Sequence, residues 1–334
     1  MKAADMHCDT ISEIYGKRRA GEDCGILKNN LNIDLEKMEQ GDYLIQNFAI
    51  FAHMENLKGK MSLPEYAFRL ADVFFTEMRK YPDRIGIVKS YGDIENNWKN
   101  GRMSAMLTME EGAICEGKPE YLRIFYELGV RMFTFTWNFQ NELAYPNRRK
   151  ETEMHDSSLV PETEFGLTEL GFSFLEEMER LGMIVDVSHL GDKGILDVIS
   201  HAKKPFVASH SNARAVCGHV RNLTDEMIRG IAEKGGVMGI NFFPDFLRDG
   251  KNEGIRLETG LDAAVAHIRH MIKVGGADCV GLGSDFDGIP VYCELTDASK
   301  MPLLEEKLRA ERFTEEEIEK IFYKNVLRVY KAVL

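Results

Sequence analysis

The sequence alternates short apolar segments with amphipathic helical patterns along almost its whole length, and this alternation limits the possible folds more than any other feature. The helical patterns place apolar residues on one face, as in 168–181 and 261–274, and several end at a glycine just before the next apolar segment. Such a glycine is a typical helix stop, because it adopts the left-handed conformation without strain. The apolar segments with the length and composition of strands are 3–8, 44–51, 105–110, 131–137, 183–189, 205–210, 237–243 and 279–285.

Eight strands separated by helices predict an α/β fold, a parallel (β/α)8 barrel of the TIM type. The chain has 334 residues, of which 44 % are hydrophobic, and this is enough for a large buried core. No linker rich in proline, glycine or serine divides the sequence. We therefore expect residues 1–334 to form a single domain.

The charge and the cysteines exclude several classes of protein. The formal net charge of −12, without a run of Lys or Arg, repels phosphate backbones and anionic lipid headgroups, so we expect no nucleic-acid partner. No stretch of about 20 apolar residues is present to span a bilayer, and no secretory leader precedes the first predicted strand. We therefore expect a cytoplasmic protein without a membrane partner. The 6 cysteines lack the spacing of a zinc finger and are expected to be reduced thiols.

Potential metal ligands follow the predicted strands at their carboxyl ends. His7 and Asp9 are two residues apart after the first strand, where the side chains of such a pair share one face of an extended chain. Alone, this pair is a weak signal. In a parallel barrel, however, the carboxyl ends of all strands open on the same mouth, so ligands that follow several strands converge there. The candidates in such positions are His7, Asp9, Glu110, His189, His210 and Asp285.

The donor atoms of these residues indicate the metal. Imidazole nitrogens and carboxylate oxygens without a thiolate suit zinc, with manganese, cobalt or iron as substitutes. Five ligands are too many for one catalytic zinc ion that keeps an open position. Two Zn²⁺ ions use them better: His7 and Asp9 would hold one ion, His189 and His210 the other, and Glu110 would lie between them.

Hydrolysis of an amide or ester follows as the reaction class. A water shared by two cations loses a proton near neutral pH, next to a carbonyl that the same ions polarise. Asp285 would take up that proton and deliver it to the leaving group. Two choices stay open at this point: Asp285 and Asp287 share one face of a strand end, and of the adjacent Glu110 and Glu111 only one can point inward.

Two other histidines have a different context. His267 and His270 lie three residues apart on the helical pattern 261–274, with no third ligand in that pattern. We expect them on a helix of the outer wall rather than in a metal site.

With these residues in view, the chain resembles the renal (membrane) dipeptidase family of binuclear zinc peptidases, a branch of the amidohydrolase-like barrels. The match runs over nearly the whole chain and agrees in order, spacing and strand context. It rests on Met6-His7-Cys8-Asp9-Thr10, Leu107-Thr108-Met109-Glu110-Glu111-Gly112, Met183-Ile184-Val185-Asp186-Val187-Ser188-His189, Ala208-Ser209-His210-Ser211-Asn212 and Gly283-Ser284-Asp285-Phe286-Asp287-Gly288.

The resemblance implies roles for individual residues. Glu110 matches the bridging carboxylate, and Asp285 matches the acid that handles the proton. Arg221 matches an arginine that binds the free carboxylate of a dipeptide, a task that suits a planar guanidinium. The resemblance also implies a homodimer. The lipid anchor of the animal enzymes is not expected, because the chain lacks their leader and their apolar C-terminal tail.

One position departs from the family. After the fourth strand the animal enzymes carry a histidine that contacts substrate, whereas this chain has Trp137 at the matching place. An indole donates one hydrogen bond and cannot carry a proton. We expect Trp137 to shape the substrate pocket, and the indole N–H or the side-chain amide of Asn138 or Asn141 to replace part of the lost contact.

The resemblance implies a metal-dependent dipeptidase, in which hydroxide held by the two ions attacks the single peptide bond and a D-residue is tolerated at the C-terminal position. The alternative is a related binuclear amidohydrolase that acts on N-acyl amino acids, lactams or lactones. A non-catalytic barrel that keeps the ligands for structure is a third hypothesis. It is disfavoured, because Asp285 then has no task.

Overall fold

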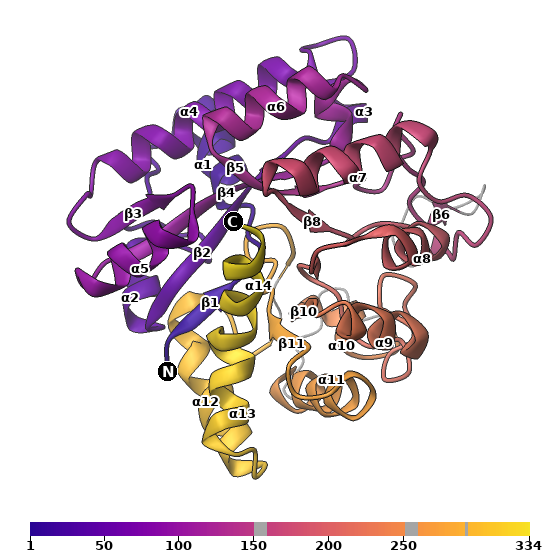
Figure 1. The fold of residues 1–334 in the computed structure, drawn as a ribbon. Helices are drawn as coiled ribbons and strands as arrows, with labels where there is room; N and C mark the ends of the chain where they lie inside the picture. The colour runs from indigo at the N-terminus through magenta and orange to yellow at the C-terminus, as the bar shows by residue number, and fades with distance from the viewer. Residues whose placement is uncertain (150–158, 251–259, 291–292) are drawn as a thin grey trace.

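In the part of the chain that the computed structural model describes, residues 1–149, 159–250, 260–290 and 293–334, eight parallel strands close into a barrel (Figure 1). The predicted fold class is thereby confirmed. The last strand pairs with the first, so the sheet has no free edge there. Around the barrel the order is β1 (Ala3–Asp5), β2 (Tyr43–Phe51), β4 (Met103–Glu110), β5 (Val130–Thr134), β8 (Ile184–Asp186), β9 (Val207–Ala208), β10 (Val237–Ile240) and β11 (Val280–Leu282).

Within the described ranges, short strands outside the barrel add to those that the sequence predicts. β3 (Ile85–Val88) pairs with the first half of β4, and β5 pairs with its second half. β6 (Arg148–Arg149) and β7 (Leu159–Val160) form a separate antiparallel pair. Segments of two to four residues carry no measurable hydrophobic period, which is why the sequence pattern does not reveal them.

Six of the eight barrel strands end earlier than the sequence pattern predicts, whereas β2 and β4 end at Phe51 and Glu110 as predicted. The predicted segments 183–189 and 279–285 run on to a candidate ligand, whereas β8 and β11 stop before it. The backbone at the two ligands is also not extended: φ is 70° at His189 and 62° at Asp285, in the left-handed region. Most candidate ligands therefore lie in the loops that follow the strands, while Glu110 is the last residue of β4.

Helices surround the barrel and separate consecutive strands (Figure 1). The predicted helix 168–181 is confirmed as α7; the Thr168 side chain accepts a hydrogen bond from the Gly171 N–H, and Gly182 ends the helix with φ of 82°. The predicted helix 261–274 is confirmed as α11. The described α-helices are α1 (Thr10–Arg19), α2 (Leu35–Gln40), α3 (Met54–Leu57), α4 (Leu63–Arg79), α5 (Tyr91–Lys99), α6 (Pro119–Leu128), α7 (Glu169–Leu181), α8 (Asp192–His201), α9 (Asp225–Glu233), α10 (Pro244–Leu247), α11 (Gly260–Gly275), α12 (Met301–Ala310), α13 (Glu315–Glu319) and α14 (Asn325–Val333).

The C-terminal helix α14 closes the end of the barrel opposite to the candidate ligands (Figure 1). Its residues Val326 and Tyr330 are fully buried against apolar side chains from the amino ends of the strands, such as Leu44 and Val237. The Tyr330 hydroxyl accepts a hydrogen bond of 2.7 Å from the side-chain amide of Asn47 inside the barrel. One end of the barrel is thus apolar and sealed, and the other is left for polar side chains.

His267 lies on α11, as expected, but its side chain faces inward and is 0 % exposed. Its Nδ1 accepts a hydrogen bond from the Ala213 N–H at 3.1 Å, and its Nε2–H donates to the Leu247 carbonyl oxygen at 3.1 Å. Burial lowers the pKa of His267 to about 4. The neutral ring therefore connects the loop after β9 to the end of α10.

Lowering the pH should destabilise the folded protein, because the fold requires His267 to be neutral. The pKa in the unfolded chain is about 6.5, so between pH 6.5 and 4 the unfolded state binds a proton that the folded state excludes. We expect the free energy of unfolding to decrease as the pH is lowered from 6.5 to 4. The contribution of His267 to this slope is up to about 1.4 kcal/mol per pH unit. Urea denaturation of the wild type and of His267→Gln from pH 4 to 7 measures this contribution, because the variant lacks it. Equal slopes in the two proteins would contradict the prediction.

Candidate metal centre

The predicted metal ligands come together at the open end of the barrel, around the carboxylate of Glu110. Oε2 of Glu110 lies 3.5 Å from His7 Nε2, which is itself 3.3 Å from Asp9 Oδ2. Oε1 of Glu110 lies 3.0 Å from His189 Nε2 and 3.7 Å from His210 Nε2. Each oxygen of this carboxylate therefore faces a different group of ligand atoms.

Asp285 joins the same cluster. Its Oδ1 lies 3.7 Å from His7 Nε2, and its Oδ2 accepts a hydrogen bond of 2.9 Å from the side-chain amide of Asn241. The Nε2 atoms of His189 and His210 are 2.9 Å apart. None of the six candidate residues is more than 8 % exposed. Because bulk water is excluded, their polar atoms depend on partners inside the site.

The local backbone is shaped to bring these groups together. His189 and Asp285 both adopt positive φ, which costs a non-glycine residue about 1–3 kcal/mol and persists where the surroundings enforce it. Gly288 leaves room for two of the carboxylates: a Cβ there would lie 2.2 Å from Asp9 Oδ2 and 2.6 Å from Asp285 Oδ1. The close approach of the two acids thus requires glycine at this position.

The electrostatics of the cluster favour a bound cation. Burial alone would lower the pKa of His7, but the Glu110 and Asp9 carboxylates raise it well above its ordinary value. Burial alone would raise the pKa of Glu110, yet His7 and His189 hold it well below its ordinary value. Burial, together with the Asp9 and Glu110 charges, raises the pKa of Asp285 to about 7. Glu110 is therefore a carboxylate, and Asp285 can exchange a proton near neutral pH.

The donor set also fits a divalent metal ion. Asp9 Oδ1 is buried and has no hydrogen-bond partner among the described residues, as expected for an oxygen that faces a cation. Cys8 lies between two candidate ligands in the sequence, but its side chain packs in the hydrophobic core and is not part of the cluster. Nitrogen and oxygen donors without sulfur suit zinc and its borderline neighbours.

The two acids that compete with Glu110 and Asp285 in the sequence have other partners. Glu111 accepts a hydrogen bond from the Trp137 N–H at 3.1 Å and thereby links two strand-end loops. Asp287 accepts hydrogen bonds from the Thr10 hydroxyl at 2.6 Å and from the Asn32 N–H at 2.7 Å. Both side chains hold the walls of the site together.

The loop after β5 carries three of the four residues predicted to contact substrate, Trp137, Asn138 and Asn141. The Trp137 ring lies 6.1 Å from the His189 ring, measured between centroids, and lines the cavity described below. The Asn138 Oδ1 lies 3.0 Å from His189 Nδ1 and so orients this imidazole. The Asn141 side-chain amide donates a hydrogen bond of 2.6 Å to Glu111. Substrate contacts of all three residues stay predictions.

Arg221 is held at the wall of the cavity by its neighbours. The Arg214 guanidinium donates hydrogen bonds to the carbonyl oxygens of Val220 at 2.7 Å and Asn222 at 2.8 Å, on either side of Arg221. Asp192 in turn binds the Arg214 guanidinium through two contacts of 2.7 and 2.8 Å. A paired Asp–Arg group thus fixes the backbone that carries Arg221.

A cavity of about 280 Å³ opens above the cluster. This volume is close to the lower end, ~300 Å³, of the range for small-molecule sites. Its polar lining includes four of the six candidate residues of the metal site and the predicted substrate residue Arg221, and its apolar lining is mostly aromatic. The residues that line it include Asp9, Glu110, His189, Arg221, Asp285, Phe51, Trp137, Phe243 and Phe246.

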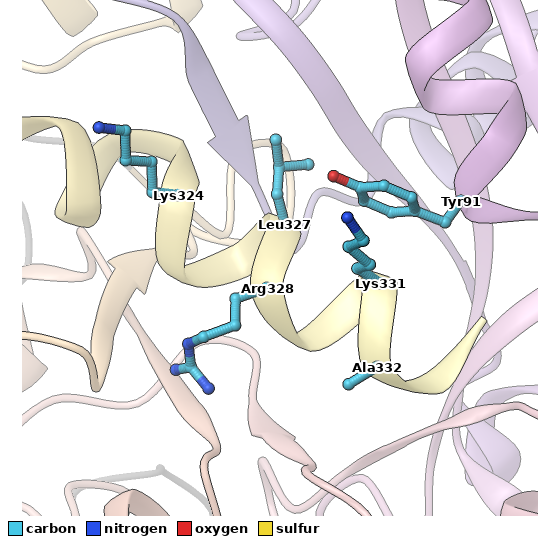
Figure 2. Close-up of a pocket in the computed structure, with 6 residues that line it drawn as sticks. All are labelled: Tyr91, Lys324, Leu327, Arg328, Lys331 and Ala332. Atoms are coloured by element: carbon cyan, nitrogen blue, oxygen red, sulfur yellow. The ribbon is translucent and has the colours of Figure 1, made fainter.

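A larger hollow of about 470 Å³ lies at the closed end of the barrel, beside α14 (Figure 2). Its cations already have partners: Arg328 donates to the carbonyl oxygens of Gly235 and Asp278 at 2.6 and 2.7 Å, and Lys331 Nζ lies 5.6 Å from the centre of the Tyr91 ring. The residues that line this hollow include no imidazole or carboxylate. The smaller cavity is therefore the one equipped for metal chemistry.

Comparison with known proteins agrees with this geometry. The family described as membrane dipeptidase, Peptidase family M19, matches residues 1–334. The chain belongs to this family. Together with the cluster at the barrel mouth, membership identifies the enzyme as a metal-dependent peptidase.

Individual relatives cover most of the enzyme. An uncharacterised protein from the pqqA 5′ region of Klebsiella pneumoniae is 37 % identical over 75 % of this chain and 89 % of its own. An uncharacterised dipeptidase of Schizosaccharomyces pombe is 33 % identical over 89 % of this chain and 71 % of its own. The crystal structure of a metallo peptidase from Rhodobacter sphaeroides, liganded with a phosphinate mimic of the dipeptide L-Ala-D-Ala, superposes with a TM-score of 0.85 and 26 % identity, over 100 % of this chain and 99 % of that one.

Sequence reasoning missed Asn241, whose amide holds Asp285. It falls inside the predicted strand 237–243 and follows β10, which ends at Ile240. A polar residue near the end of an otherwise apolar strand was the available signal, the same one that identified the ligands. Phe51, the last residue of β2, was also missed, because an apolar residue at a strand end does not stand out.

None of the helices in the described ranges is long and apolar enough to cross a membrane.

Substitution of Gly288 by alanine should weaken metal binding. The added Cβ would push Asp9 and Asp285 apart, so we expect zinc affinity to fall by about 10-fold or more, in the range seen when groups that support a metal site are lost. Competition with a chromophoric chelator measures the affinity. Gly16→Ala in α1 is the matched control, because a Cβ there meets nothing within 4 Å. Unchanged affinity in Gly288→Ala would show that the close packing at this glycine does not support the site.

Proposed function

We propose that this enzyme is a dipeptidase with two zinc ions. His7 and Asp9 would hold one ion, His189 and His210 the other, and Glu110 would bridge them. The single observation that carries the proposal is the placement of Glu110, with Oε2 toward His7 at 3.5 Å and Oε1 toward His189 at 3.0 Å. A carboxylate whose two oxygens face separate ligand groups is suited to two cations.

Two such cations, when bound, would polarise the scissile carbonyl and activate a water molecule for attack on it. Asp285 would serve the proton transfers. Asn241 binds its Oδ2, which leaves Oδ1 facing the cluster to take the proton of the attacking water and then to pass it to the nitrogen of the departing amino acid. The peptide bond breaks and the two amino acids leave.

Substrate recognition would use the wall of the cavity. Arg221 would bind the C-terminal carboxylate through its planar guanidinium, and the Arg214–Asp192 pair would keep it in place. The Trp137 indole would limit the side chains that fit. The small volume of about 280 Å³ favours dipeptides over longer peptides. We also propose that a D-residue is accepted at the C-terminal position, because the similar Rhodobacter sphaeroides enzyme binds a mimic of L-Ala-D-Ala.

We further infer that residues 1–334 act as one domain, since β1 and β11, from opposite ends of the chain, are neighbours in the barrel. The homodimer and the cytoplasmic location expected from the sequence stay predictions.

A substrate panel separates dipeptidase activity from the alternative amidohydrolase activity. The zinc-loaded enzyme is expected to hydrolyse L-Ala-L-Ala and L-Ala-D-Ala and to leave their N-acetylated forms intact, because a free amine is part of the proposed substrate. Release of amino acids, followed by chromatography, gives kcat/KM for each compound. A preference for N-acyl amino acids, lactams or lactones would contradict the dipeptidase proposal.

Substitution of Arg221 by lysine should raise KM more than it lowers kcat. Lysine keeps the positive charge but loses the bidentate geometry, and a hydrogen bond between charged groups is worth about 1.5–3 kcal/mol, or roughly 10-fold to 100-fold in KM. Steady-state kinetics with a dipeptide measure the loss. The C-terminal amide of the same dipeptide is the control, since it offers no carboxylate. An equal loss for both substrates would show that Arg221 does not bind the carboxylate.

A further inference from the structure

Two buried aspartates support the metal centre from equivalent positions. Asp5 is the last residue of β1, and Asp186 is the last residue of β8. The Asp5 carboxylate accepts two hydrogen bonds from Ser284, one from its backbone N–H at 2.9 Å and one from its hydroxyl at 2.6 Å. The Asp186 carboxylate likewise accepts two hydrogen bonds from Ser209, one from its backbone N–H at 2.9 Å and one from its hydroxyl at 2.6 Å. Each serine directly precedes a residue of the cluster, so the two arrangements are matched.

The two serine hydroxyls differ in their remaining contacts, and Ser284 Oγ accepts a hydrogen bond from the Phe286 N–H at 3.2 Å. Ser209 Oγ also lies 2.7 Å from Nδ1 of His210. Ser284 Oγ instead lies 3.3 Å from the carbonyl oxygen of His7, and among the described residues it has no imidazole contact. Only the Ser209 hydroxyl therefore connects a buried carboxylate to the ring of a proposed metal ligand.

The hydrogen atoms of this chain of contacts can be assigned. A carboxylate accepts hydrogen bonds and donates none, so the single hydrogen of the Ser209 hydroxyl points to Asp186 at 2.6 Å. The other nearby acceptor, Ser188 Oγ, is farther away at 3.3 Å. The Ser209 oxygen must then accept its second hydrogen bond from His210, which places a hydrogen on Nδ1 of the ring.

This assignment leaves Nε2 of His210 with a lone pair that faces the centre, 3.7 Å from Glu110 Oε1. We propose that Ser209, held by Asp186, is a positioning residue that fixes His210 in the tautomer able to bind the second metal ion. His210, Ser209 and Asp186 are at most 1 % exposed, so water cannot take over the role of the hydroxyl. Partners of this kind orient metal-binding histidines and affect affinity strongly.

The inference rests on the two-ion centre of the proposed function and not on the dipeptide substrate. Without the Ser209 hydroxyl, the His210 ring loses the acceptor for its Nδ1–H, and the tautomer with hydrogen on Nε2 becomes accessible. That tautomer has no lone pair for the ion. Affinity at the position of His189 and His210 should fall, whereas the ion held by His7 and Asp9 should be little affected.

The test compares Ser209→Ala with Ser284→Ala, which removes the same hydrogen bond to an aspartate but no imidazole contact. Zinc binding is measured by competition with a chelator, and the tautomer of His210 by nitrogen-15 NMR of histidine-labelled protein. We expect Ser209→Ala to lower the affinity for one of the two zinc ions by about 10-fold to 100-fold. The hydrogen on the His210 ring should move from Nδ1 to Nε2. Ser284→Ala should keep the Nδ1–H tautomer and the affinity of the second ion.

Further variants keep the test decisive. Ser209→Thr retains the hydroxyl and should retain the affinity for the second ion, and Ser209→Cys, whose thiol is a weak acceptor, replaces Ser209→Ala if that variant does not fold. An equal loss of affinity in Ser209→Ala and Ser284→Ala, or a wild-type His210 with hydrogen on Nε2, would overturn the inference. Binding of a single zinc ion by the wild type would overturn the two-ion centre itself, and the NMR result would still report on the tautomer.

Discussion

The buried carboxylate of Glu110, surrounded by three imidazoles, is the interaction on which the open end of the barrel depends. Removing an ionised carboxylate from water costs several kcal/mol unless positive charge compensates it. In the protein alone, His7 provides this compensation, and the pKa of each group is shifted toward its charged form. Metal ions would provide it more strongly. We therefore expect metal binding to stabilise the loops after β1, β4, β8 and β9.

The two ends of the barrel have different roles: the closed end contributes stability, and the open end carries the candidate metal ligands. At the closed end, α14 seals the barrel with apolar side chains such as Val326 and with the buried Tyr330. At the open end, His189 and Asp285 adopt left-handed backbone conformations that disfavour folding locally. The sealed end and the surrounding helices supply the stability that allows this strain. The same division explains why the larger hollow beside α14 carries no candidate chemistry.

Much of this architecture could be predicted from the sequence, because buried parallel strands and amphipathic helices leave strong hydrophobic patterns. The ends of the strands could not, since a left-handed residue such as His189 has no hydrophobic signature. Period-two alternation correctly allowed only one of Glu110 and Glu111 to face the centre, because Glu110 lies in a true strand. It failed to separate Asp285 from Asp287, because β11 has already ended and both residues have positive φ.

The second layer of the site was also out of reach of sequence reasoning. Contacts such as Asn138 with His189, or Ser209 with Asp186, join residues that follow or end different strands, and no local pattern predicts them. Arg214 is a further example, because this loop residue supports Arg221 and is itself bound by Asp192 of α8. These contacts determine the orientation of the groups that the sequence motifs identify.

Anomalous diffraction from crystals of the zinc-loaded enzyme tests the two-ion centre most directly. Data collected on both sides of the zinc absorption edge should show two peaks at the barrel mouth. One peak should lie beside His7 and Asp9, the other beside His189 and His210, with one oxygen of Glu110 next to each. A single peak, or two peaks of which neither is bound by Glu110, would contradict the bridging role of this carboxylate.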